Sequence, residues 1–482
     1  MPRRRPPNRP PYVKSVHSAR PHKNPHRCLR QGNAVSVVET QPPLPADVSA
    51  LRTGIWSTTA TQDQDGVLNI GGVPVTEIAE RYGTPAYVFD EADFRMRCTT
   101  YREAFHDFDI YYASKAFLTR TSARIAKETG LSLDVCTEGE LAYAKAVDFP
   151  PERVLMHGNN KSEAELAAAL EYGVGRIVVD SREELDRLEA LLPSFPNSRP
   201  GVLLRVTVGV RADTHAHIAT AHEDQKFGFS LVSGEAEEAV RRVVDNGLLE
   251  LRGLHSHIGS QILTTQGFEA AAKRLVGLRA KLAEDGIDLP ELDLGGGFGI
   301  AYTSEDQPTP AAEMADILRT AVAKECAQLG VSVPRLAIEP GRAIAGPSGA
   351  TLYRVGTVKH REGIRTFVAV DGGMSDNVRT ALYAATYTVQ LAGRISDAAP
   401  TLVRVVGKHC DAGDVVVRDD HLPADVRAGD LIAVPGTGAY CRSLAHNYNQ
   451  IPRPPVIAVL EGRAREIVRR ETVADLMGLD VG

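Results

Sequence analysis

Short apolar runs alternate with stretches of helical periodicity between about residues 85 and 340. Each run stops at a polar, charged or glycine residue, and stretches such as 163–172 and 182–192 between them have the period of helices. This alternation is typical of β/α units around a parallel sheet. The runs lie at 109–115, 131–134, 153–157, 176–180, 202–205, 251–257, 291–295 and 335–339. Eight units predict an α/β fold, a TIM-like (β/α)8 barrel with its chemistry at the carboxyl ends of the strands.

The pattern changes after Gly341, where helical periodicity nearly disappears. Short alternating runs follow, separated by Gly, Asp and Pro, at 351–358, 366–370, 401–406, 414–417 and 430–434. They predict a second domain, an antiparallel β-barrel or sandwich. We therefore expect the barrel at 85–345 and the β domain at 346–482, with residues 49–84 packing on the β domain.

The first 48 residues have a different composition, rich in Pro, Arg, His and Asn and without a hydrophobic period. Such a segment buries too little apolar surface to offset its ordering entropy, so we expect a disordered, basic, Pro-rich tail. Residues 1–38 hold nine Lys or Arg and no Asp or Glu; removing these nine charges from the net −6 leaves −15 on the rest. An acidic body argues against nucleic acid as the main partner.

Several other classes of protein are disfavoured by composition. No run of 18 apolar residues occurs, which argues against a membrane span, and the basic start lacks the apolar stretch of a secretory signal. The six cysteines show no CxxC spacing, so neither a zinc site nor a disulfide scaffold is expected. These features favour a cytoplasmic protein without a metal site.

Candidate chemistry lies where the predicted strands end. Lys115 ends the first strand; it could be an ordinary surface lysine, or it could hold a carbonyl cofactor as an imine. Gly295, Gly296 and Gly297 follow the seventh strand, where barrels often bind phosphate, although a flexible turn would also explain them.

The sixth and eighth strands end in further polar residues. Glu339 and Arg342 stand together and could form a structural salt bridge, or could serve a cofactor ring nitrogen and an anion respectively. His255 and His257 could be core histidines; we expect at most one of them to face the barrel mouth, with Ser260 adding a hydroxyl just beyond.

Cys410 lies in the polar stretch Gly407–Asp414 of the β domain. A thiol with an ordinary pKa is mostly protonated at pH 7, so an exposed cysteine there could donate a proton. An incidental loop cysteine is the alternative.

Taken together, ten motifs resemble those of the fold-type III pyridoxal-phosphate decarboxylases, whose fold is alanine-racemase-like. They are YYASKAF (111–117), DVCTEGEL (134–141), HGNNKS (157–162), EDQKFGF (223–229), GLHSHIGSQI (253–262), DLGGGFGI (293–300), EPGRAI (339–344), DGGMSDNVRTALY (371–383), GKHCDAGD (407–414) and GAYCRSL (438–444). The resemblance covers about residues 65–475 and implies pyridoxal 5′-phosphate as cofactor. It is closest to the branch that converts meso-2,6-diaminopimelate to L-lysine.

The resemblance also implies roles for individual residues. Lys115 would form the covalent link to the cofactor, His257 would stack on its ring, and Glu339 would hold its ring nitrogen protonated. The remaining cofactor contacts would be Asp134, Ser260, Gly295, Gly296, Gly297, Gly341, Arg342 and Tyr440.

Substrate contacts and assembly follow from the same resemblance. The substrate would be bound by Arg342, Arg379, Tyr383, Asp411 and Tyr440. Cys410 would supply the proton that replaces CO2 and would come from the partner subunit. The resemblance therefore implies a homodimer with shared active sites.

One departure from the family pattern bears on the substrate. The family usually has Cys-Glu-Ser where this chain has Cys410-Asp411-Ala412, which shortens the acidic side chain and removes a hydroxyl. The alternatives are a sibling decarboxylase acting on ornithine, lysine, arginine or a carrier-linked amino acid, an amino-acid racemase, and a non-catalytic regulatory homologue.

Overall fold

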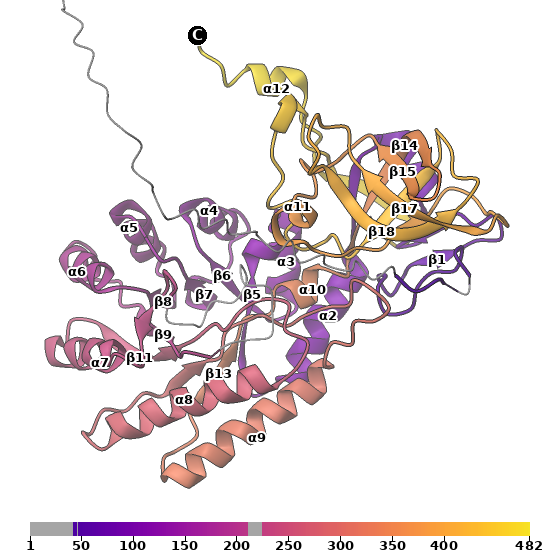
Figure 1. Ribbon diagram of the computed structural model, residues 1–482. Helices are drawn as coiled ribbons and strands as arrows, with labels where there is room; N and C mark the ends of the chain where they lie inside the picture. The colour runs from indigo at the N-terminus through magenta and orange to yellow at the C-terminus, as the bar shows by residue number, and fades with distance from the viewer. Residues whose placement is uncertain (1–41, 46, 211–223) are drawn as a thin grey trace, which may run out of the picture. The chain divides into compact units, whose positions relative to one another are not determined.

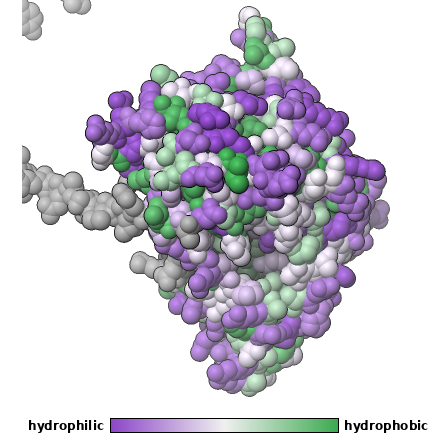
Figure 2. Space-filling view, turned by 90° about the vertical axis from the view of Figure 1, so that its right-hand side faces the viewer, coloured by the Kyte–Doolittle hydropathy of each residue, from purple (hydrophilic) through white to green (hydrophobic). Residues whose placement is uncertain are grey.

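The computed structural model describes residues 42–45, 47–210 and 224–482 (Figure 1). Most of the expected basic tail, residues 1–41 and 46, lies outside these ranges, and so does Glu223 of the EDQKFGF motif. In the described ranges, no helix combines the length and apolarity needed to cross a membrane. Figure 2 shows a face on which hydrophilic residues are interspersed with hydrophobic ones.

Eight parallel strands of the described chain close into a barrel, and each coincides with a predicted apolar run (Figure 1). The strands are β5 (Asp109–Ala113), β6 (Ser132–Val135), β7 (Val154–Met156), β8 (Arg176–Val179), β9 (Gly201–Thr207), β11 (Glu250–His255), β12 (Glu291–Asp293) and β13 (Arg335–Ile338). The sheet closes because β13 pairs with β5 and β9 pairs with both β8 and β11. The short β10 (Phe229–Ser230) adds to β9. The predicted (β/α)8 barrel is confirmed.

Helices cover the outside of this barrel. They are α2 (Glu91–Ala104), α3 (Arg120–Glu128), α4 (Glu138–Ala146), α5 (Glu163–Tyr172), α6 (Arg182–Leu191), α7 (Glu235–Asn246), α8 (Gln266–Ala283) and α9 (Ala311–Leu329). Short 3-10 turns occur elsewhere in the described chain, at Ser114–Ala116, Pro151–Arg153, Leu192–Ser194 and Tyr448–Gln450. Thr119, Thr137, Ser162 and Ser181 accept a hydrogen bond from a backbone N–H of the first turn. Such caps satisfy exposed donors at the helix start, so these residues fix where helices begin after the strands.

The second domain is a β structure with one extended sheet. In sheet order its strands are β18 (Val415–Pro423), β17 (Pro400–Val406), β15 (Arg365–Val370), β14 (Gly349–Arg361), β4 (Ala86–Asp90), β20 (Val456–Leu460) and β21 (Arg463–Val468), while β19 (Leu431–Pro435) pairs with β14 and with β16 (Gln390–Leu391). Most neighbours are antiparallel, as expected, but β15 with β17 and β4 with β20 are parallel. The short helix α10 (Arg342–Ala345) follows β13 at the end of the barrel segment, and the short helices α11 (Arg379–Tyr383) and α12 (Val473–Met477) belong to the β domain.

Strand β4 differs from the sequence expectation, because it falls inside the range expected for the barrel yet pairs with β14 and β20. Before it come β1 (Thr61–Gln62), β2 (Leu68–Ile70), β3 (Val73–Pro74) and α1 (Val75–Tyr82). Their buried side chains, such as Leu68 and Ile78, share an apolar cluster with Leu352 and Ile457 of the β domain. The segment from β1 to β4 therefore packs on or joins the β domain, and the chain enters the barrel only after it.

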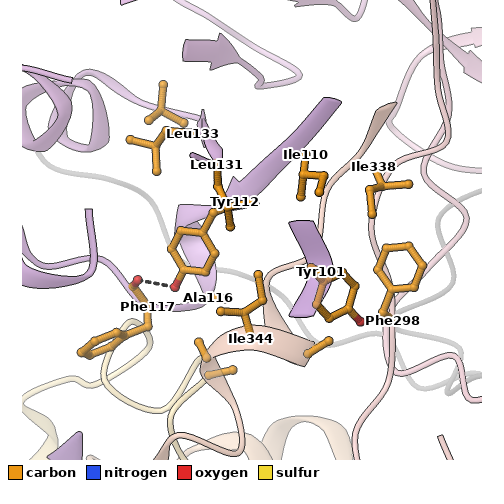
Figure 3. Close-up of a cluster of buried hydrophobic side chains, with 14 of the residues drawn as sticks. Tyr101, Ile110, Tyr112, Ala116, Phe117, Leu131, Leu133, Phe298, Ile338 and Ile344 are labelled. Carbon is orange, nitrogen blue, oxygen red and sulfur yellow. Dashed lines mark hydrogen bonds between the residues drawn. The ribbon is translucent and has the colours of Figure 1, made fainter. Parts of the chain in front are cut away.

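The barrel interior changes from apolar to polar toward the carboxyl ends of the strands. The apolar part of the interior is the cluster of Tyr111, Leu155, Val178, Leu203 and Ala337. Figure 3 shows part of a separate, larger core, in which Tyr112 of β5 donates a hydrogen bond to the carbonyl of Phe117 at 2.6 Å. Charged and polar side chains are also buried at strand ends, namely Asp134, His157, Arg205, His255, Asp293 and Glu339. Burying an ionisable group costs roughly several kcal/mol unless a partner compensates. The concentration of buried ionisable side chains at these strand ends therefore marks the candidate site.

Candidate active site

A cavity of about 470 Å³ opens at the carboxyl end of the barrel. Its wall contains ten residues that the sequence analysis selected, namely Lys115, His257, Ser260, Gly297, Glu339, Gly341, Arg342, Arg379, Tyr383 and Tyr440. Arg379, Tyr383 and Tyr440 come from the β domain, so both domains build the cavity. The selected Asp134, Gly295, Gly296, Cys410 and Asp411 do not line it.

Lys115 lies in the 3-10 turn directly after β5, and its side chain lines the cavity. Burial of the ammonium lowers its pKa, but Asp134, Cys136 and Tyr440 raise it more, so the pKa of Lys115 is raised overall. Asp134 itself is buried, with a pKa raised to about 6 by burial and only partly lowered again by His157 and Lys115. The lysine is thus held as a cation in the absence of a covalent partner.

Glu339 is held by two buried histidines. His157 Nε2 lies 2.5 Å and His255 Nε2 3.3 Å from the same oxygen, Glu339 Oε1. Burial alone would raise the pKa of Glu339. The two histidines lower it by more than burial raises it, so the pKa of Glu339 lies well below its ordinary value. Glu339 is therefore ionised at neutral pH.

Asp293 at the end of β12 has the opposite character from Glu339. Burial and the nearby Glu339 anion raise the pKa of Asp293 well above its ordinary value. Its Oδ1 accepts a hydrogen bond from Gly295 N at 2.8 Å. The pKa values of these two neighbouring buried carboxyl groups are thus shifted in opposite directions, as expected when like charges share a site.

The glycine loop after β12 allows backbone to approach backbone. A Cβ on Gly295 would lie 2.5 Å from the carbonyl oxygen of Ser256, and one on Gly296 would lie 2.2 Å from that of Glu339. Gly296 N donates to His257 Nδ1 at 3.2 Å, which fixes that ring at the cavity wall. Gly295 N also has a partner, the Asp293 carboxyl group. Of the three N–H groups in this triplet, that of Gly297 is the one that makes no hydrogen bond to a described residue.

His255 and His257 occupy different places at the end of β11. His257 lines the cavity, whereas His255 is buried beneath it against Glu339. Burial and the positive charge of Lys115 hold the pKa of His257 well below its ordinary value, so the ring is neutral. A neutral, fixed imidazole suits a flat ligand ring.

Two arginines, Arg342 and Arg379, line the cavity. Arg342 donates to Ser260 Oγ at 2.6 Å and to the Tyr302 hydroxyl at 2.6 Å, and Arg379 donates to the same hydroxyl at 2.9 Å. Both are buried, at 6% and 5% exposure. Within the described part of the chain, neither forms an ion pair with a carboxylate, so the pair offers an anion-binding site.

Tyr440 connects the β domain to the Lys115 turn. Its N–H donates to the carbonyl of Ala116 at 2.7 Å, and its backbone has φ 68°, a conformation that non-glycine residues rarely adopt. Its ring lies 4.7 Å from the Arg342 guanidinium carbon. Such strained positions often occur where a side chain must be held in a site.

Cys410 and Asp411 lie away from this cavity, in the loop between β17 and β18. Cys410 is exposed. Asp411 Oδ1 accepts from Gly413 N at 2.7 Å and Oδ2 accepts from the Tyr448 hydroxyl at 3.4 Å. Within a single chain these two residues therefore do not meet Lys115.

Three buried residues of this site, His157, Asp293 and Tyr302, were not among the candidates selected from the sequence, and His255 was considered there only as one of two histidines. His157 belongs to the HGNNKS motif, and Asp293 begins DLGGGFGI, so position at a strand end was the available signal. Tyr302 follows its strand by several residues and carried no such signal.

The residues fit pyridoxal phosphate by their chemistry. An amine projects into the cavity, an anionic carboxylate is fixed beneath it, and a neutral imidazole stands on the wall. The tight glycine loop, Ser260 and Arg342 offer donors for a phosphate.

Comparisons with known proteins agree with this chemistry. Residues 91–346 match the family described as "Pyridoxal-dependent decarboxylase, pyridoxal binding domain". The diaminopimelate decarboxylase of Mycobacterium tuberculosis (strain ATCC 25618 / H37Rv) is 53% identical over 441 residues, covering 89% of this chain and 98% of the relative. That of Bacillus subtilis (strain 168) is 46% identical over 431 residues, covering 88% and 97%. The solved diaminopimelate decarboxylase of M. jannaschii in complex with L-lysine has a TM-score of 0.83 at 30% identity, covering 88% and 98%.

Proposed function

Because the chain belongs to the diaminopimelate decarboxylases, which are pyridoxal-phosphate-dependent enzymes, we propose that it converts meso-2,6-diaminopimelate to L-lysine and CO2. This is the last step of lysine biosynthesis. The observation that carries the proposal is the joining of Lys115, Glu339 and two unneutralised arginines around one cavity. When bound, the cofactor supplies an electron sink for the pair released as CO2 leaves.

The residues would hold the cofactor as follows. Lys115 provides the amine for the covalent link, Glu339 keeps the ring nitrogen protonated by its fixed negative charge, and His257 covers a ring face. The phosphate is bound by Ser260, Arg342 and the glycine loop, with Asp134, Gly341 and Tyr440 around the cofactor. These roles rest on the resemblance and on the geometry described above.

Arg342, Arg379 and Tyr383 are proposed to bind the substrate carboxylates. A diaminodicarboxylate carries a second carboxylate at its far end, and buried guanidinium groups without a counter-ion stabilise such an anion. A substrate that lacks the far carboxylate leaves these cations unpaired, which is how the site would select its substrate.

We further propose a homodimer with shared active sites. Cys410 is exposed and lies outside the cavity of its own chain, which fits a thiol supplied to the cavity of a partner subunit. Asp411 would reach the substrate by the same route. Analytical ultracentrifugation of the holoenzyme tests the dimer, and a monomer with full activity would contradict it.

Cys410→Ala is expected to retain bound cofactor and to lower kcat by about a hundredfold or more, the usual range for a lost general acid. Steady-state kinetics and the cofactor absorbance of the purified variant measure the two effects. Cys326→Ala, which changes a buried cysteine of helix α9, is the control and should keep turnover. Full turnover in Cys410→Ala would show that another group donates the proton.

The experiment that tests the proposed function is a decarboxylation assay with pyridoxal phosphate and meso-diaminopimelate, compared with ornithine, lysine and arginine. We expect turnover of meso-diaminopimelate far above the others. Negligible activity on it, with turnover of another amino acid, would favour the second candidate, a sibling decarboxylase. That candidate is favoured by the shortened Asp411, whose carboxylate is bonded within its own loop and to Tyr448.

We propose that the first 41 residues are a dispensable extension. The contacts made by the residues that follow indicate how far a deletion can extend before it affects the fold. Gln390 Nε2 donates to the carbonyls of Val48 and Ser49, and Arg52 pairs with Asp420 at 2.5 Å. Deleting residues 1–41 should leave turnover unchanged, and deleting 1–48 should do so as well. Deleting 1–56 should lower Tm, because it also removes the ion pair and the buried Trp56. Loss of turnover in folded protein lacking 1–41 would contradict this assignment.

The five described cysteines are all free. Free thiols persist in reducing compartments, and we therefore propose that the enzyme works in the cytoplasm.

A further inference from the structure

Tyr302 links the two arginines that face the cavity. Its hydroxyl oxygen accepts one hydrogen bond from Arg342 Nη1 at 2.6 Å and another from Arg379 Nη1 at 2.9 Å. The residue is buried and lines the cavity. A single oxygen therefore sets the distance between two guanidinium groups that come from different domains.

The position of Tyr302 is fixed on several sides. Asp306 Oδ2 accepts from the backbone N–H groups of Tyr302 and Thr303, at 2.9 and 2.8 Å. A Cβ on Gly436 would lie 3.2 Å from the Tyr302 ring, and the Tyr387 ring packs edge-on against it with centroids 5.1 Å apart. Backbone and ring are thus both held, so the hydroxyl cannot follow an arginine that moves.

The hydroxyl proton of Tyr302 is available to a ligand. A phenol has one O–H donor and two acceptor positions, and both acceptor positions are used by the arginines. In the described residues, this O–H meets no acceptor. The hydroxyl lies at the cavity wall between two cations. The group expected to accept its proton in a hydrogen bond is therefore an anion that carries oxygen atoms.

We propose that Tyr302 is a specificity-determining residue: it fixes the spacing of Arg342 and Arg379 and donates its phenolic proton to the carboxylate that the substrate keeps. The inference rests on the proposed function, because it concerns the far carboxylate of a diaminodicarboxylate. It assigns a third donor to the anion site. Binding then requires a carboxylate that reaches Tyr302 and at least one arginine together.

Two small molecules isolate this contact. L-lysine and cadaverine have the same carbon chain with two amino groups, and they differ by one carboxylate. Tyr302→Phe removes only the hydroxyl oxygen and keeps the packed ring. The variant should therefore weaken the binding of L-lysine about tenfold, the usual cost of a lost hydrogen bond to a charged group, and change that of cadaverine less than about twofold.

Tyr387→Phe is the matched control, because the Tyr387 hydroxyl accepts from Arg379 but has no contact with Arg342 and does not line the cavity. It should weaken L-lysine binding less than about threefold. Dissociation constants come from titrating each holoenzyme and following the cofactor absorbance. With meso-diaminopimelate, Tyr302→Phe should raise KM about tenfold and change kcat less than about threefold.

The outcomes separate this inference from the proposed function. Equal weakening of L-lysine and cadaverine, no weakening of either, or an equal effect of Tyr387→Phe would overturn the role of Tyr302 while wild-type turnover stands. Absence of wild-type turnover of meso-diaminopimelate would instead overturn the proposed function. Cofactor content and thermal unfolding of each variant verify that the folded holoenzyme is being compared.

Discussion

Lys115→Ala is expected to abolish the visible absorbance of the lysine-bound cofactor and to lower turnover by roughly a thousandfold or more. The reason is the position of Lys115: its side chain enters the cavity directly after β5, beneath the donors proposed for the phosphate and beside Glu339. A substituted chain could still bind the cofactor through these other contacts, but without a covalent link.

Absorbance spectra and steady-state kinetics of the purified variant measure both effects. Reducing the wild-type holoenzyme with borohydride should also add the cofactor mass to the peptide that contains Lys115. Lys273→Ala is a suitable control, because that side chain is 69% exposed on helix α8, and it should leave both the spectrum and turnover unchanged. A wild-type spectrum in Lys115→Ala would refute the assignment of the lysine.

Glu339→Gln should lower kcat by about a hundredfold to a thousandfold, the range observed when a fixed charge or dipole opposite a developing charge is removed. A neutral amide leaves the ring nitrogen without an anionic partner, although it can still accept from His157 or His255. Glu339→Asp keeps the charge but shortens the side chain, so it should lose less than the amide variant. Measuring kcat and the cofactor dissociation constant for both variants tests this.

Asp293→Asn provides a stringent control for the Glu339 variant. The raised pKa of Asp293 means that its neutral form is favoured, and an amide resembles that neutral form and keeps the acceptor for Gly295 N. It should therefore lose less than about tenfold in kcat, although the position is as buried as Glu339. Equal losses in the two amide variants would show that charge at Glu339 is not what matters.

The depressed pKa of Glu339 also predicts how the enzyme responds to acid. A carboxyl group with a lowered pKa stays ionised at every pH above the ordinary glutamate pKa near 4.3, and it is protonated only at a pH well below that pKa. Burial lowers the pKa of both His157 and His255, so at neutral pH the Glu339 carboxylate interacts with neutral imidazole rings. This interaction is lost only as the pH falls below that value. An acid limb of kcat above about pH 5 should accordingly persist unchanged in Glu339→Asp, because it would belong to another group.

The barrel could be predicted because its strands are buried on both faces, which makes each one a continuous apolar run. Strand β4 shows where this reasoning fails. Residues 86–90 form an equally apolar run, but their partners, β14 and β20, lie far along the chain, and no local pattern states which sheet a strand joins. The assignment of β4 is set by tertiary pairing alone.

The candidate site divides in the same way. Residues at strand ends, such as Lys115 and Glu339, were found because barrels place chemistry there. Asp293 and Tyr302 were not, because their importance depends on which atoms they contact in the folded interior. The sequence could also not show that two of the three N–H groups in the glycine triplet already have partners.

The placement of β4 has a consequence for folding during synthesis. Because the β sheet contains residues from both before and after the barrel, the barrel is an insertion within the second domain. Residues 91–345 leave the ribosome before β14 exists, so the barrel can close while β4 is still an unpaired apolar strand. Pairings between such distant segments form slowly. The last part of this enzyme to become native is therefore among the first parts to be made.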